Sequence, residues 1–256
     1  MNERFVEIPT RDGRMETFVT HPEQDGPFPP VIIYMDVWGV REELYDIARR
    51  GAAVGYYGMV PDFYHRQGKI RSDYFDAKGR RISLNRLSPE DQRKVLAPHE
   101  KLSDAMVVED TGAIFEFLRR GEPAKREGGA IGYCMGGRHV MGVAAAYPEH
   151  VKASASLHGT MLISDRKDSP HLSVAKLRGE LYCGFAEIDH YAPPAMIDQL
   201  ADLLRPCAVG YRHEIHKGAE HGYALPDRDI YDKRAAERDW ELIFAMFRRQ
   251  IPAYAP

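Results

Sequence analysis

Apolar segments of two kinds alternate along most of this chain, and no other feature constrains its fold as strongly. Short runs such as residues 31–35 (VIIYM) are continuously apolar, as expected of strands that are buried on both faces of a sheet. Segments with helical spacing lie between them, such as residues 41–50, where Leu44, Ile47 and Ala48 fall on one face. This alternation predicts βαβ units around a mostly parallel sheet.

The same interpretation places the remaining elements. Around the turn Arg11-Asp12-Gly13 we expect a hairpin formed by residues 5–8 and 15–19. Further strands are predicted within 53–60 and at 128–132, 153–157, 181–185 and 209–215, and helices at 41–50 (closed by Gly51), 103–120, 194–204, 231–249 and from the strand at 128–132 to near Pro148. No repeat or linker interrupts the pattern, so we expect a single domain over residues 1–256, built as a three-layer sandwich.

Residues 66–102 break the rhythm, because they are polar, charged and poor in aliphatic clusters. We interpret them as an excursion over the surface. Insertions of this kind often cover a functional site, and a solvated loop with a short helix is an equally good interpretation.

Composition excludes several classes of function. The formal charge of −3 gives no basic surface for nucleic acid or an anionic membrane. No apolar run reaches the roughly 18 residues of a membrane span, and the N-terminus lacks a secretory pattern, so we expect a cytoplasmic protein. Three cysteines, Cys134, Cys183 and Cys207, cannot form a disulfide framework and lack zinc-site spacing.

The strongest chemical signal is the sequence GYCMGG at residues 132–137, between a predicted strand and a predicted helix. It matches the nucleophile elbow G-x-S-x-G with cysteine in place of serine. The N-terminus of the following helix favours a thiolate at Cys134, and the backbone N–H of Met135 is a candidate oxyanion donor. The alternative is that Cys134 is an ordinary small buried residue.

A general base is sought among eleven histidines, and His221 has the best position. It lies in a glycine-flanked segment that is predicted to be a loop (KGAEHG, residues 217–222), after the last predicted strand and before the final helix, where α/β-hydrolases carry their base. His213 and His216 are three residues apart on a strand, which puts them on opposite faces and argues against a shared metal.

The orienting acid is expected in the segment AEIDH at residues 186–190, after the strand at 181–185. Asp189 gives the chain order nucleophile, acid, base that α/β-hydrolases use. Glu187 is the competing candidate.

The end of the strand at 31–35 carries a further group of candidates. Asp36 is expected at the carboxyl edge of the sheet, where open α/β sheets bind ligands, and the N–H of Val37 is the second candidate oxyanion donor. Asp36 could instead cap the next helix or bind local amides.

Three further side chains are candidate substrate-binding residues: Trp38, Tyr64 and His158. Core packing of the two aromatic residues and backbone hydrogen bonding of the histidine are the simpler alternatives. No phosphate loop, dinucleotide fingerprint or H-E-x-x-H motif is present, so we expect no cofactor and no metal.

With these residues identified, the chain resembles the dienelactone hydrolase family, a cysteine-dependent branch of the α/β-hydrolases. The resemblance rests on segments 35–39 (MDVWG), 60–64 (VPDFY), 132–137 and 218–222 (GAEHG) and on the Asp189 loop. It implies the α/β-hydrolase fold, with Cys134 as nucleophile, His221 as base and Asp189 as its orienter. It also implies that Asp36 contacts the thiol and helps to form the thiolate when substrate binds.

Two positions depart from the family pattern. Asp36 stands where the family usually has glutamate, and Leu225 stands where it has an arginine that holds the substrate carboxylate. Arg228 is three residues away from that position, and Arg66, Arg81 and Arg93 are open candidates for a second anion-binding arginine.

The expected function is hydrolysis of a small ester or lactone through a thioester at Cys134, by a protein that is a monomer or a small homo-oligomer. The alternative is a thiol-based binding or redox-sensing protein on the same fold, because fold does not determine function.

Overall fold

The computed structural model describes residues 1–255, which form an eight-stranded sheet with the order β1-β2-β4-β3-β5-β6-β7-β8. The strands are β1 (Asn2–Thr10), β2 (Gly13–His21), β3 (Pro30–Tyr34), β4 (Tyr57–Pro61), β5 (Gly128–Tyr133), β6 (Val151–Leu157), β7 (Glu180–Ile188) and β8 (Gly210–Glu220). Strands β3 to β8 are parallel, and the hairpin β1-β2 joins antiparallel to β4. The predicted mostly parallel sheet is confirmed.

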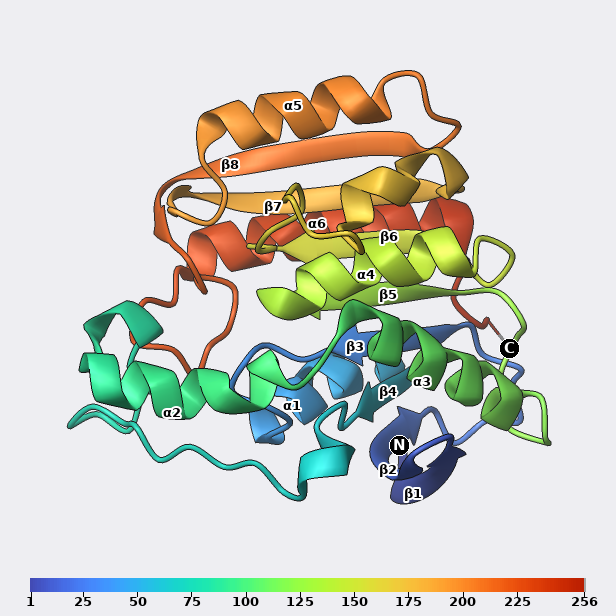
Figure 1. Ribbon diagram of the computed structural model, residues 1–256. Helices are drawn as coiled ribbons and strands as arrows, with labels where there is room; N and C mark the ends of the chain where they lie inside the picture. The colour runs from blue at the N-terminus through green and yellow to red at the C-terminus, as the bar shows by residue number, and fades with distance from the viewer. Residues whose placement is uncertain (256) are drawn as a thin grey trace.

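Helices cover both faces of the sheet (Figure 1). They are α1 (Glu42–Ala52), α2 (Pro89–Glu100), α3 (Asp104–Leu118), α4 (Met135–Ala146), α5 (Pro194–Leu204) and α6 (Lys233–Gln250). In Figure 1, α3 and α4 lie in front of the sheet, with α1 and α6 behind it. This is the predicted three-layer sandwich. Helix α2 lies apart, beyond one end of the central strands. Within residues 1–255, no helix combines the length and the apolar character needed to cross a membrane.

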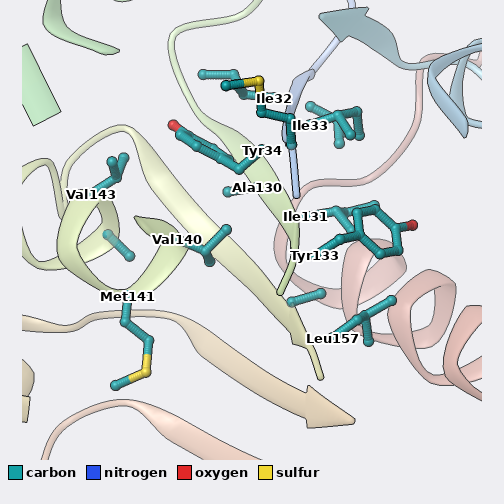
Figure 2. Close-up of a cluster of buried hydrophobic side chains, with 14 of the residues drawn as sticks. Ile32, Ile33, Tyr34, Ala130, Ile131, Tyr133, Val140, Met141, Val143 and Leu157 are labelled. Carbon is teal, nitrogen blue, oxygen red and sulfur yellow. The ribbon is translucent and has the colours of Figure 1, made fainter. Parts of the chain in front are cut away.

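The central strands bury both of their faces, which explains why they appear in the sequence as unbroken apolar runs. Figure 2 shows Tyr34 and Ala130 directed toward α4, while Ile33 and Ile131 point to the opposite face. This packing fixes the position of each strand along its own axis relative to the neighbouring strands. It thereby places the carboxyl ends of β3 and β5 side by side.

Several predicted boundaries differ from the structure, and two of the differences have a clear physical cause. Helix α1 continues through Gly51 to Ala52, because the left-handed conformation that ends this segment falls on Gly55, with φ of +99°. Residues 217–220 belong to β8 and not to a loop, because pairing of Glu220 with Ile188 of β7 extends the strand to the residue before His221.

Candidate active site

Cys134 occupies a sharp turn between β5 and α4, with φ of 57° and ψ of −118°. A Cβ atom on Gly132 would lie 2.1 Å from the carbonyl oxygen of Gly136, and one on Gly136 would lie 2.3 Å from that of Tyr34. Any side chain at either position would force the strand and helix apart. The glycine spacing of the motif is thus a steric requirement of the turn that holds Cys134.

His221 connects Cys134 to Asp189. Its Nε2 lies 3.3 Å from the sulfur, and its Nδ1 lies 2.7 Å from Oδ2 of Asp189. The carboxylate of Asp189 is fully buried, whereas the imidazole is 12% exposed. The three side chains that sequence analysis selected therefore form one chain of hydrogen bonds, in the order Cys134, His221, Asp189.

The pairing of β7 with β8 explains why Asp189 and His221 lie close together. Asp189 follows β7, His221 follows β8, and the backbone N–H of His221 donates to Ile188 O at 3.2 Å. The second oxygen of Asp189 accepts the N–H of Tyr191 at 2.9 Å, which fixes the carboxylate. Glu187, the competing acid, is exposed and accepts the N–H of Gly218. Of these two candidate acids, only Asp189 bonds to the imidazole.

The charges around His221 favour its protonated form. Burial of the ring lowers its pKa, but the negative charge of a thiolate at Cys134 and the hydrogen bonds to Asp189 and Cys134 outweigh that effect and raise the pKa of His221 to about 9. At neutral pH the ring is then an imidazolium beside the sulfur. This is the arrangement that activates a cysteine nucleophile.

These residues face a cavity of about 80 Å³. Six of the predicted site residues line it: Asp36, Val37, Trp38, Cys134, Met135 and His221. The N–H of Met135 belongs to the first turn of α4, whose N–H groups have no acceptor within the helix, so it is free to bind an oxyanion. Within residues 1–255, no cluster of three or more His, Cys, Asp or Glu side chains is suited to holding a metal ion.

Asp36 lines the cavity, but the groups that donate hydrogen bonds to its carboxylate are not the thiol of Cys134. Arg41 donates to both of its oxygens, at 2.7 and 3.1 Å, and the N–H of Trp38 donates at 3.1 Å. Among the described residues, no hydrogen bond joins Asp36 to Cys134. Helix α1 begins at Glu42, so Asp36 binds a local amide and does not cap the helix.

The structure does not bring Tyr64 and His158 to the cavity wall. The hydroxyl of Tyr64 is buried and donates to Val37 O at 3.3 Å. The Nδ1 atom of His158 accepts the backbone N–H of Cys134 at 3.2 Å, and burial lowers the pKa of His158 well below its usual value. Both side chains therefore hydrogen-bond to the backbone that surrounds the cavity and do not line the cavity themselves.

A large part of the cavity wall comes from residues to which sequence analysis assigned no role. Arg228 was named there only as a neighbour of the expected anion-binding position, and the 66–102 excursion only as a segment that covers a site or forms a solvated loop. The 66–102 excursion contributes Ser83, Leu84, Asn85, Leu96 and His99, and other loops contribute Thr160, Met161, Tyr191 and Arg228. Tyr191 could have been found from its closeness to Asp189. The excursion gave no such signal, because its polar sequence has no periodicity.

The excursion is tethered to the loop that carries Arg228. The backbone N–H of Arg81 donates to Asp227 O at 2.7 Å, and the N–H of Asp229 donates to Arg81 O at 3.0 Å. Arg86 then bridges Asp229, at 2.7 Å, and Glu220, at 2.9 Å. One wall of the cavity is thus fastened to the strand end that precedes His221.

Comparisons with known proteins show the family of the chain. The sequence model of the dienelactone hydrolase family matches residues 15–251. A relative from Methylorubrum extorquens, provisionally named carboxymethylenebutenolidase, is 26% identical over 248 residues, which cover 95% of this chain and 80% of that protein. A relative from Synechocystis with the same provisional name is 26% identical over 251 residues, covering 96% of both chains.

Two solved structures share the fold. A protein from Klebsiella pneumoniae, provisionally named dienelactone hydrolase, superposes with a TM-score of 0.82 at 23% identity, covering 96% of this chain and 98% of that one. A dienelactone hydrolase from Anabaena variabilis superposes with a TM-score of 0.66 at 14% identity, covering 97% and 98%.

Proposed function

Because the chain belongs to the dienelactone hydrolase family, whose members are carboxylic ester hydrolases with the α/β-hydrolase fold, we propose that it cleaves small esters or lactones through a thioester at Cys134. One observation carries this proposal: His221 lies within hydrogen-bonding distance of both Cys134 and Asp189, at the wall of a cavity. The small cavity volume favours a compact substrate.

The proposed reaction has two halves. The thiolate of Cys134 attacks the carbonyl carbon, and the N–H groups of Met135 and Val37 bind the oxyanion. As the C–O bond breaks, His221 gives its proton to the leaving alkoxide, and a thioester remains. His221, now neutral, takes a proton from water, which attacks the thioester and releases the acid and the thiolate.

The pH profile tests this mechanism. An alkoxide leaving group needs the proton of His221, which is bound below the pKa of about 9 and lost above it. For an ethyl ester or an unactivated lactone, we expect kcat/KM to fall about tenfold per pH unit as pH rises above about 9. The 4-nitrophenyl ester of the same acid is the control, because its leaving group needs no proton, and its profile is expected to stay flat there. A steep decline for both esters would contradict the assigned role.

Arg228 is the best candidate for binding a substrate carboxylate. Its side chain is 5% exposed and lines the cavity, yet its nearest carboxylate oxygen, on Asp36, is 3.5 Å away and already bound to Arg41. Its Nε atom has no acceptor among the described residues. Three guanidinium groups (Arg41, Arg81, Arg228) here face two carboxylates (Asp36, Asp227). One guanidinium charge is therefore not balanced by either of these carboxylates, and it is available to bind a negatively charged group of a ligand.

Arg228→Gln is expected to lower the kcat/KM for a carboxylate-bearing lactone, relative to that for a neutral lactone of similar size, by about 30-fold, because it removes a charge-assisted contact. Steady-state kinetics on both substrates measure this ratio. Arg93→Gln is the matched control, since Arg93 is exposed on α2. An unchanged ratio in Arg228→Gln would remove Arg228 from substrate recognition.

A further inference from the structure

Several buried polar atoms without a hydrogen-bond partner gather in one region next to the cavity. They are Nδ1 of His99, Oδ2 of Asp104 and Nη2 of Arg138, while Nε2 of the neighbouring His139 lies 3.1 Å from the other oxygen of Asp104. Buried polar atoms in proteins are nearly always paired, so a group of unpaired atoms requires a cause. Together they offer donors and acceptors to a polar group of a ligand.

This region connects to the cavity through two side chains. His99, on α2, lines the cavity directly. Met161 also lines it, and its sulfur accepts from Nη1 of Arg138 at 3.7 Å. A thioether is a weak acceptor for a guanidinium that is only 1% exposed. Met161 is itself 37% exposed and its side chain is unbranched and flexible, so a ligand can displace it.

The unpaired atoms favour a neutral ligand group. Arg138 offers a donor and Asp104 an acceptor, and the charges of Arg138 and Arg166 are balanced by Asp104 and Asp168. Burial and the charge of Arg138 lower the pKa of His99 to about 4, so that its ring is neutral. A hydroxyl group satisfies such a set, because it donates one hydrogen bond and accepts others.

We propose that His99, Arg138 and Asp104 form a second polar subsite, which binds a neutral hydroxyl group of the substrate. The proposal rests on the function proposed above and narrows it to hydroxylated esters or lactones. The hydroxyl accepts from Nη2 of Arg138 and donates to Oδ2 of Asp104 or to His99. Rejection of an unhydroxylated substrate follows, because it leaves these atoms unpaired.

Two pairs of esters test the subsite, each exchanging a hydroxyl for a methyl group of similar size. One pair places the group on the leaving phenol (4-hydroxyphenyl and 4-methylphenyl acetate). The other places it on the acyl chain (phenyl 3-hydroxypropanoate and phenyl butanoate). In at least one pair we expect kcat/KM to favour the hydroxylated member about tenfold. We expect this preference to be lost in His99→Leu and reduced in Arg138→Lys.

His150→Leu is the matched control, because His150 bonds to the carbonyl of Arg126 outside the cavity, and it should keep the wild-type preference. Thermal unfolding verifies that each variant is folded. If His99→Leu does not fold, the substrate preference of Arg138→Lys tests the subsite. Equal kcat/KM values within both pairs, or a preference that survives both variants, would mean that the cluster holds only water. A wild-type protein that hydrolyses no ester at all would instead overturn the proposed function.

Discussion

Replacement of Cys134 by alanine is expected to reduce the turnover of esters and lactones to background, a loss of at least about 10⁴-fold in kcat. Among the residues that line the cavity, Cys134 alone carries a thiol that can form the proposed thioester. In the wild type, rapid quenching during turnover of 4-nitrophenyl acetate followed by peptide mapping should find the acetyl group on Cys134. Cys207→Ala is the control and should retain wild-type kcat, because Cys207 bonds to the carbonyl of Leu203 at the end of α5.

Two results would contradict this expectation in different ways. Turnover that survives Cys134→Ala would remove the nucleophile assignment while leaving the hydrolase in place. An absence of turnover by the wild type on a broad ester panel, together with rapid oxidation of Cys134 by peroxide, would favour the redox-sensing alternative.

His221→Gln is expected to lower kcat by at least about 10³-fold and to slow alkylation of Cys134 by iodoacetamide at neutral pH. Glutamine can bond to Asp189, but it has no titratable proton and no positive charge, so it cannot hold the sulfur as a thiolate. Steady-state kinetics and the rate of labelling measure the two effects separately.

His213→Gln is the matched control, because it lies on the same strand, β8, away from the cavity. An unchanged labelling rate in His221→Gln would show that the imidazole does not activate the thiol. A labelling rate that falls while kcat stays at the wild-type value would exclude His221 from the chemical steps.

The parts of the site that could be predicted from sequence are those determined by local geometry. The glycines around Cys134 are required by contacts within one turn, and their spacing is therefore visible in the sequence. His221 and Asp189 were selected by their order after particular strands, because parallel strands bring their carboxyl ends to one edge. Competition between Asp189 and Glu187 needed coordinates, since both come after the predicted strand at 181–185, whereas in the structure β7 extends to Ile188 and includes Glu187.

The rest of the site depends on contacts between segments that are distant in the sequence. His99 reaches the cavity only because residues 81–86 dock on residues 227–229 through backbone pairing and ion pairs. The bidentate bond between Arg41 and Asp36 likewise has no sequence signature. No periodicity predicts such contacts, because each depends on the complete fold.

The tether between the 66–102 excursion and residues 227–229 also limits how new substrate ranges can arise. A chimera that exchanged the excursion alone would remove Arg81 and Arg86. It would leave Asp227, Asp229 and Glu220, the neighbour of the base, without these partners. The excursion and residues 227–229 are therefore expected to change together during evolution, and such a change affects both substrate selectivity and reaction rate.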